Sequence, residues 1–262
     1  MRFKITLLVD KSKFGNRLPL NYQYELSSFI YRAIAKADVG YASWLHENGF
    51  NLNGKMFKLF TFSNLIVPQY GIEKERGLLR IDSDRVEWQI SFLPEKSTEK
   101  FVCGLFSEQE FQIGDKKSVV QFKVERIEML PPPIFQPEMS FRTLSPVCIS
   151  YRREGERHPD YLSPDTPEVS GIILNNLLNK HLAFYDKPYE GDCEFAFEVI
   201  NRPKAKLIAI KTGTPEASNV RGYMFDFRMK APEGLMRIMY ESGMGEKGSL
   251  GFGCVEYKAL LP

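Results

Sequence analysis

Cysteine is scarce in this 262-residue chain, and no two cysteines form a C-x-x-C pair. Zinc sites and redox dithiols are therefore not expected, and buried free thiols are the favoured alternative. No grouping of His, Cys, Asp or Glu has the spacing of metal ligands, so no metal site is predicted. The four cysteines are Cys103, Cys148, Cys193 and Cys254.

Long apolar runs are absent too, since no stretch approaches the roughly eighteen residues of a membrane span. The amino terminus, MRFKITLLVD, alternates and carries a charge at Lys4, which indicates a strand rather than a signal peptide. We therefore expect a cytoplasmic protein with no membrane partner. The formal net charge is only +2 and the pI about 8.2. These values permit a nucleic acid partner without indicating one, because strongly basic binders usually exceed a pI of about 9.

The first half of the chain has the periodicity of alternating strands and helices. With 43% apolar and 26% charged residues, the composition is that of a folded protein long enough for two domains. Apolar residues recur at helical spacing in two main segments, separated by strand-like alternation. The order β-α-β-β-α-β follows, with an additional short helix after the first. Strands are expected at 2–10, 58–67, 78–81, 85–93 and 118–130, and helices at 21–38, 41–48 and 95–109.

A proline-rich stretch, PPPIFQPEM, separates this half from the next. Such a stretch is stiff and cannot join a central strand, so we expect domains at 1–130 and 139–262 joined by a linker at 131–138. The element order then repeats, with Thr166 as the expected N-cap of the long helix. The fold class predicted is α+β, with two tandem ferredoxin-like β-α-β-β-α-β domains. The second set comprises strands at 140–152, 193–202, 220–230 and 252–260 and helices at 165–185 and 232–242.

The glycine-rich stretch GMGEKGSLGFG, residues 243–253, begins with a match to the dinucleotide fingerprint G-x-G-x-x-G. That fingerprint needs a strand before it, a helix after it and an acidic residue about twenty positions later. Here a helix precedes the glycines, a strand follows them, and the chain is nearly finished. The dinucleotide interpretation fails on context, and no cofactor is predicted.

The same glycine-rich stretch, in ESGMGEKGSLGFGCV, resembles the signature of the CRISPR-associated RAMP proteins. It is most similar to the ending of the endoribonucleases that cut CRISPR precursor RNA into guide RNAs. The segments MRFKITLLV, LPLNYQYELSSFIYRAI, WLHE and KLFTFS are similar in order and spacing to that family's first domain. The resemblance implies CRISPR repeat RNA as partner, and leaves association with effector-complex proteins and a homodimer open.

The resemblance also implies catalytic roles for Tyr31, His46 and Lys58, with Lys55 as an alternative lysine. RNA supplies its own nucleophile, so cleavage needs only a base for the 2′-hydroxyl, an acid for the departing 5′-oxygen and positive charge on the phosphorane. Histidine suits acid or base work, lysine supplies a compact cation, and tyrosine is more plausible as a positioning group. The implied products carry a 2′,3′-cyclic phosphate and a 5′-hydroxyl. His158 and His181 are assigned no catalytic role.

Two segments are candidates for RNA binding. NRPKAKLIAIK is basic and suits a strand laid along phosphates, although a lysine-guarded sheet edge would have the same pattern. The glycine loop could hold a phosphate with backbone N–H groups or could be a purely structural tight loop. RGYMFDFR partly fits an RNA-stacking strand, but we favour burial of its aromatic rings. The candidate RNA-binding residues are Arg202, Lys204, Lys206, Lys211, Gly243, Gly245, Lys247, Gly248, Ser249, Gly251 and Gly253.

Two other functions remain open at this stage. A RAMP subunit that binds repeat RNA without cutting it would share the same motifs, and a ferredoxin-like module for a small ligand or a protein partner would share the fold. Tyr31 alone would be read as a packing residue and His46 as a surface residue. We expect the glycine loop to contact the RNA backbone and to be separate in role from His46.

Overall fold

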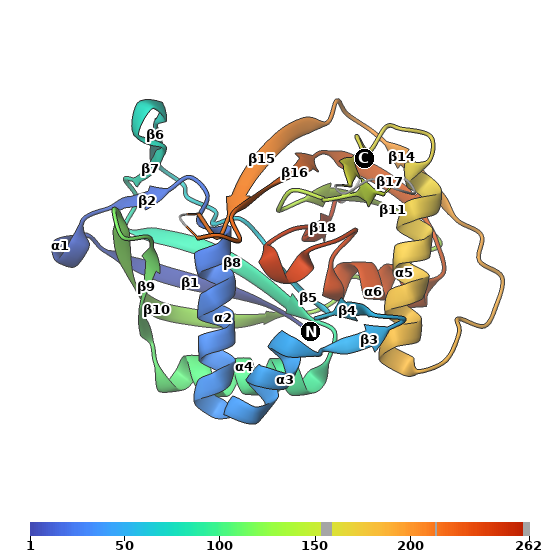
Figure 1. The fold of residues 1–262 in the computed structure, drawn as a ribbon, viewed down its shortest axis with the longest axis horizontal. Helices are drawn as coiled ribbons and strands as arrows, with labels where there is room; N and C mark the ends of the chain where they lie inside the picture. The colour runs from blue at the N-terminus through green and yellow to red at the C-terminus, as the bar shows by residue number, and fades with distance from the viewer. Residues whose placement is uncertain (153–158, 213, 259–262) are drawn as a thin grey trace.

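The computed structural model describes residues 1–152, 159–212 and 214–258. Its first half is built on a five-stranded antiparallel sheet in the order β5-β8-β1-β10-β9 (Figure 1). Alternating apolar residues of the central strand, such as Ile5 and Leu7, are fully buried. The strands are β1 (Arg2–Asp10), β5 (Phe60–Phe62), β8 (Arg85–Phe92), β9 (Glu110–Gly114) and β10 (Val119–Leu130).

Helices α2 (Gln23–Ala37) and α4 (Glu95–Ser107) pack against each other beside this sheet. The buried face of α2 includes Leu26 and Ile30, as its helical periodicity predicts. A shorter helix, α3 (Val39–Glu47), follows directly. Asp38 ends α2, and its carboxylate accepts a hydrogen bond from the Tyr41 backbone N–H, which caps α3.

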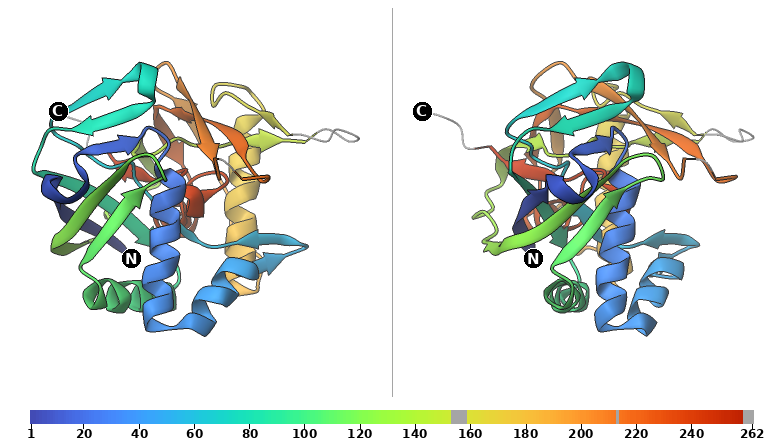
Figure 2. Two further views of the ribbon diagram at one scale, coloured as in Figure 1. Left: turned by 60° about the vertical axis from the view of Figure 1, so that its left-hand side comes forward. Right: turned by 90° about the vertical axis from the view of Figure 1, so that its left-hand side faces the viewer.

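The second half contains a four-stranded antiparallel sheet in the order β14-β17-β11-β18 with helices α5 and α6 packed together (Figure 2). Helix α5 begins at Val169, so the expectation that Thr166 caps it is wrong. Thr166 lies in the preceding turn, where its carbonyl oxygen accepts from the Val169 N–H. The elements are β11 (Glu138–Thr143), α5 (Val169–Tyr185), β14 (Ala196–Val199), β17 (Asp226–Lys230), α6 (Glu233–Ser242) and β18 (Val255–Tyr257).

The two sheets share one topology. If the four strands common to both are counted along the chain, each sheet has the order second, third, first, fourth. Among the described residues, three α-helices (Lys11–Phe14, α2 and α3) follow the first strand in the first half and one (α5) does so in the second, and in each half one α-helix follows the third strand. Residues 131–136, between β10 and β11, adopt no helix or strand. The element order predicted from the sequence is thus present twice.

The single strand expected over residues 220–230 is divided in the structure. Its first part, β16 (Ser218–Met224), pairs with β15 (Lys204–Ile210) in a separate ribbon, and its second part, β17, joins the four-stranded sheet. Phe225 and Phe227 are buried and Tyr223 is partly buried against the same core. These rings therefore pack inside the protein, as the favoured interpretation of RGYMFDFR requires.

Several short elements surround this framework. Strand β7 (Leu78–Ile81) matches the strand expected at 78–81 and β12 (Ser150–Tyr151) falls within the one expected at 140–152, whereas the others were not expected. A hairpin of β3 (Phe50–Leu52) and β4 (Lys55–Phe57) follows α3. Among the described residues, no helix is long and apolar enough to cross a membrane. The remaining elements are α1 (Lys11–Phe14), β2 (Arg17–Pro19), β6 (Tyr70–Glu73), η1 (Lys74–Arg76), β7 (Leu78–Ile81), β12 (Ser150–Tyr151), β13 (Asp160–Tyr161) and η2 (Gly248–Leu250).

Candidate active site

Tyr31, His46 and Lys58 lie together in the structure. The rings of Tyr31 on α2 and His46 on α3 meet edge to face, with centroids 5.1 Å apart and planes at 85°. Lys58, between β4 and β5, donates from Nζ to the carbonyl oxygen of His46 at 2.7 Å. His46 is exposed, and the other two are partly buried. The Tyr31 and His46 rings are therefore in contact, and the Lys58 ammonium group lies at the backbone of His46.

The β3–β4 hairpin is what returns the chain from α3 to this point. Asn53 and Gly54 form its two-residue turn, both with positive φ, as in hairpins that fit the twist of their strands. Gly49, which leads from α3 into the hairpin, has a φ of 58°. A Cβ there would lie 2.6 Å from the Phe57 carbonyl oxygen and 3.0 Å from Cδ of Lys58. Glycine at position 49 thus allows the close approach of Lys58 to the end of α3.

Burial shifts the acid strength of two of these groups in opposite directions. Loss of solvation raises the pKa of the Tyr31 phenol well above its ordinary value, and a hydrogen bond with the Ser249 side chain only partly offsets this. The Tyr31 ring also packs against Phe60, at 5.7 Å between centroids. Partial burial lowers the pKa of Lys58. Tyr31 is therefore a protonated hydrogen-bond donor, and Lys58 is a more acidic ammonium than a solvated one.

Lys55, the alternative lysine, is engaged elsewhere. Its Nζ forms an ion pair with Oε1 of Glu246 at 2.9 Å, and the other carboxylate oxygen of Glu246 accepts from Ser150 at 2.6 Å. Burial raises the pKa of Glu246, but these two hydrogen bonds outweigh burial and hold it below its usual value. Lys55 therefore ties the hairpin to the second domain, whereas Lys58 faces His46.

The glycine loop packs directly against the elements that carry these residues. Ser27 of α2 donates to the Ser249 carbonyl oxygen at 2.6 Å, and Thr61 of β5 donates to the Phe252 carbonyl oxygen at 2.8 Å. The Ser249 side chain bonds to Tyr31 as described above. The loop therefore lies close to Tyr31 in space, while its separation in role from His46 stays a prediction.

Four of the loop glycines are buried within the protein, against the expectation that they face an RNA backbone. At Gly245, for example, a Cβ would lie 2.4 Å from the Cys148 carbonyl oxygen, and φ is 75°. These positions need glycine for close backbone packing and for positive φ. Only Lys247, Gly248 and Ser249 remain accessible for contact with RNA. The buried glycines are Gly243, Gly245, Gly251 and Gly253.

A cavity of about 100 Å³ lies between the hairpin and the glycine loop, and it contains a residue that the sequence did not indicate. Lys58 and Ser249 line it, together with Asn176 and Lys180 of α5. Lys180 is almost fully buried, and desolvation, assisted by the nearby charge of Lys55, lowers its pKa to about 7. One signal was available, since Asn176 and Lys180 are four residues apart on the buried face of a helix that is otherwise apolar there.

The basic segment forms an exposed ribbon. Lys204 and Lys206 occupy alternate, exposed positions of β15 and therefore share one side of the β15–β16 ribbon, and Arg202 is exposed just before it. Lys211, at the far end of β15, has positive φ and forms an ion pair with Glu216. The role of these residues in RNA binding stays a prediction.

Of the other two histidines, only His181 lies among the described residues, and it is remote from the site. His158 lies outside the described residues, and Nδ1 of His181 is 3.2 Å from the Lys187 carbonyl oxygen near the end of α5. Among the residues that the structure describes, no three or more His, Cys, Asp or Glu side chains are grouped so that they could hold a metal ion.

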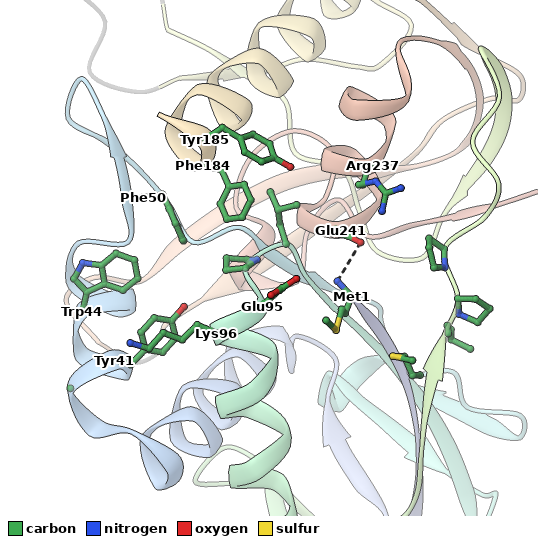
Figure 3. A pocket seen from close by; sticks show the side chains of 17 residues that line it. Met1, Tyr41, Trp44, Phe50, Glu95, Lys96, Phe184, Tyr185, Arg237 and Glu241 are labelled. Carbon is green, nitrogen blue, oxygen red and sulfur yellow. Dashed lines mark ion pairs between the residues drawn. The ribbon is translucent and has the colours of Figure 1, made fainter. Parts of the chain in front are cut away.

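A larger hollow, of about 1110 Å³, lies beside α3 but away from the three converging residues (Figure 3). Aromatic rings from both domains line it, including Trp44, Phe50 and Phe184 in edge-to-face contact. Trp44 faces this hollow, whereas His46, two residues later on the same helix, faces Tyr31. None of Tyr31, His46 and Lys58 lines this hollow.

Comparisons with known proteins agree with this arrangement of two domains. The model described as CRISPR-associated protein Cas6, N-terminal, matches residues 17–127, and the model described as CRISPR-associated protein Cas6, C-terminal, matches residues 130–257. The CRISPR-associated endoribonuclease Cas6 1 of Methanocaldococcus jannaschii is 32% identical over 97% of this chain and 92% of its own length. The CRISPR-associated endoribonuclease Cas6 of Pyrococcus furiosus is 31% identical over 98% of this chain and 89% of its own length.

A solved structure described as a RAMP protein binding different RNA substrates superposes with a TM-score of 0.82 at 26% identity, over 99% of this chain and 100% of that one. The similarity spans both domains, and so includes the hairpin, the two helices and the glycine loop that form the candidate site. The chain belongs to the Cas6 family of CRISPR-associated RAMP endoribonucleases.

Proposed function

We propose that this protein is a metal-independent endoribonuclease that binds CRISPR repeat RNA and cuts precursor transcripts into guide RNAs. The observation that carries the proposal is the convergence of Tyr31, His46 and Lys58 from three separate segments. The non-catalytic alternative, a RAMP subunit that only binds repeat RNA, would not require an exposed imidazole between a protonated phenol and a partly desolvated ammonium group.

The roles follow from the geometry and the protonation states. His46 removes the proton of the 2′-hydroxyl, whose oxygen attacks the adjacent phosphorus in line. Tyr31, kept protonated by burial, donates to a phosphate oxygen and positions it. Lys58 stabilises the negative phosphorane and gives a proton to the 5′-oxygen as its bond to phosphorus breaks. The products are a 2′,3′-cyclic phosphate and a 5′-hydroxyl, so atoms and protons balance without a further reactant.

The repeated strand order supports two tandem ferredoxin-like domains, with boundaries near 1–130 and 139–262 and a linker at 131–138. The exposed lysines of the β15–β16 ribbon and Lys247 of the loop supply positive charge for the RNA backbone. The catalytic groups come from the first domain, and the glycine loop of the second domain completes their surroundings.

The experiment that tests this function is incubation with the repeat RNA of its own CRISPR array in EDTA. We expect one cut per repeat, with no cut in an RNA carrying a single 2′-deoxy at the cleavage point, because that RNA lacks the nucleophile. His46→Ala should reduce the rate by about 10²–10⁴-fold while leaving RNA affinity nearly unchanged.

The matched control is His181→Ala, which removes an imidazole remote from the site. Cutting of the 2′-deoxy RNA, or a His46→Ala protein as active as the parent, would overturn the mechanism. Tight binding of both RNAs with cleavage of neither would establish the non-catalytic alternative instead.

A further inference from the structure

Lys180 is a buried cation whose hydrogen-bonding capacity is only partly used. It is 5% exposed, and its Nζ donates to the carbonyl oxygen of Gly243 at 2.6 Å. Within the described part of the chain, no carboxylate forms an ion pair with it. A buried ammonium group is normally paired, because desolvation of its charge is costly. One neutral acceptor leaves two N–H groups of Lys180 for a further partner.

The space beside Lys180 is a formed cavity and not a packing defect. Its volume of about 100 Å³ exceeds the roughly 30 Å³ that a water molecule occupies in the liquid, so it admits a small polar group. Asn176, one helical turn before Lys180, also lines it and is 7% exposed. Its side-chain Oδ1 is buried without a hydrogen-bond partner. Two largely buried polar side chains on α5 therefore line the same cavity, and Nζ of Lys180 is the cationic donor that they bring to it.

The charges around the cavity favour an anion. Lysines line it from the hairpin side, from α5 and from the glycine loop, against the single carboxylate of Glu246. That carboxylate is already engaged by Lys55 and Ser150. The cationic residues are Lys55, Lys58, Lys180 and Lys247.

We propose that this cavity is a subsite for an RNA backbone phosphate adjacent to the scissile one, bound by Lys180 of the second domain. The proposal rests on the proposed function. Lys58 lines the cavity and also contacts the His46 carbonyl oxygen, so it stands between the two phosphates. Lys180 thereby holds the neighbouring nucleotide and fixes the scissile bond relative to His46.

Binding of this phosphate is coupled to protonation of the Lys180 side chain. In the unliganded protein burial and the charge of Lys55 hold the pKa of Lys180 near 7, and only Glu246 acts in the opposite direction. Lys58 and Lys247 add further positive charge around it. A phosphate beside Lys180 stabilises the charged form and raises this pKa. Above neutral pH the RNA must therefore bind with uptake of about one proton.

The first test measures affinity for repeat RNA that carries the single 2′-deoxy and is not cut. Lys180→Met keeps the length and apolar volume of the side chain, and Lys187→Met is the control, since Lys187 is an exposed lysine just beyond the same helix. We expect Lys180→Met to weaken binding about tenfold or more and to reduce the slope of log affinity against log salt by about one. Lys187→Met should change neither substantially.

The second test identifies the phosphate. Uncharged methylphosphonate linkages are placed one at a time on either side of the cleavage point. We expect a neutral linkage next to the scissile one to weaken binding to the parent protein but not to Lys180→Met, because that protein has already lost the contact. If each neutral linkage weakened binding equally in the parent and in Lys180→Met, the proposal would be overturned. It would also be overturned if the two proteins differed only at the scissile linkage itself.

Proton uptake by the parent protein tests the proposal even if Lys180→Met fails to fold. Calorimetry at about pH 8 in buffers of different ionisation enthalpy should show uptake of about one proton with the all-phosphate RNA and clearly less with the methylphosphonate neighbour. No difference between the two RNAs would count against the subsite. All three measurements use uncut RNA, so a failure of the subsite is distinguishable from a failure of the catalytic function.

Discussion

Burial divides the chemical roles among the individual residues of the site. A phenol whose pKa is raised by desolvation cannot accept a proton near neutral pH, so Tyr31 acts as a donor. An ammonium group whose pKa is lowered gives up a proton more readily, which suits Lys58 to the departing 5′-oxygen. In the proposed mechanism the base is therefore His46. The assignment depends on the surroundings of each side chain and not on its residue type alone.

We expect a sulfur substitution in the RNA to separate the acid from the base. When the 5′-bridging oxygen is replaced by sulfur, the leaving group departs without needing a proton. Lys58→Ala should cut ordinary RNA about 10²-fold or more slowly and should recover much of that loss with the sulfur substrate, whereas His46→Ala should recover none. Lys187→Ala, which removes an exposed lysine just beyond α5, is the control and should behave as the parent in both assays. If only His46→Ala recovered its cleavage rate with the sulfur substrate, His46 would be the acid and Lys58 the base.

The sequence indicated these residues unequally, for reasons visible in the structure. Tyr31, His46 and Lys58 stand within short segments that resemble a known family, so they could be named although their proximity could not be derived. Lys180 has no such segment around it, and its only signal is a polar side chain on an apolar helical face. Its importance depends on Gly243, sixty-three residues away in the chain, whose carbonyl oxygen it contacts.

At the scale of elements, long strands and helices were predictable and short ones were not. Strands β3 and β4 have three residues each, too few for alternation to be recognised. The Asn53-Gly54 pair was nevertheless a hairpin signal, and it marks the turn that returns Lys58 to His46. The division of β16 from β17 has no comparable signal, since both belong to one alternating segment.

A substitution in the glycine loop tests whether the loop positions Ser249 against Tyr31. At Gly248 an added Cβ would lie 2.7 Å from the Phe60 carbonyl oxygen and 3.0 Å from that of Ser242, so the loop must move away from β5. Ser249 then shifts relative to Tyr31. We expect Gly248→Ala to lower the cleavage rate by up to about a hundredfold, because a shift of about 1 Å in a positioning group can have an effect of this size. The affinity for RNA should fall much less.

The control for the loop substitution is Gly171→Ala in α5, where a Cβ meets nothing within 4 Å. Single-turnover cleavage and equilibrium binding should both match the parent. A Gly248→Ala protein that loses affinity but keeps its rate would restore the loop to a purely RNA-binding role.

At the scale of the whole molecule, the site exists only where the two domains meet. In the proposed mechanism the first domain supplies the catalytic side chains, while the second supplies Ser249 beside Tyr31 and Lys180 in the neighbouring cavity. The sequence predicted two similar domains but not how they dock. Their contact depends on side-chain to backbone bonds such as that from Thr61 to Phe252, which leave no periodic pattern.

Arg2 connects the two domains through several contacts of one side chain. It belongs to β1, is 1% exposed, and its two terminal nitrogens donate to the carbonyl oxygens of Val255 and Tyr240 in the second domain. Its guanidinium group also stacks over the Tyr240 ring, with Cζ 3.6 Å from the centroid. Because guanidinium is planar and forked, it satisfies both carbonyl groups at once, which an ammonium group does less well.

Replacing Arg2 should therefore weaken the docking and, through it, the chemistry. Arg2→Met removes the guanidinium donors of two buried carbonyl groups, of which that of Tyr240 keeps only a long hydrogen bond from Ser91 Oγ at 3.4 Å. We therefore expect a loss of about 2–4 kcal/mol in the free energy of unfolding, with Arg2→Lys intermediate. Arg126→Met, which breaks an exposed pair with Glu128, should cost well under about 1 kcal/mol. Thermal unfolding measures these losses of stability. The cleavage rate of Arg2→Met should also fall at temperatures where the protein remains folded. The reason is that Ser249 and Lys180 of the second domain are then held less firmly against Tyr31 and Lys58 of the first. Unchanged unfolding with an unchanged rate would show that the remaining contacts dock the domains without Arg2.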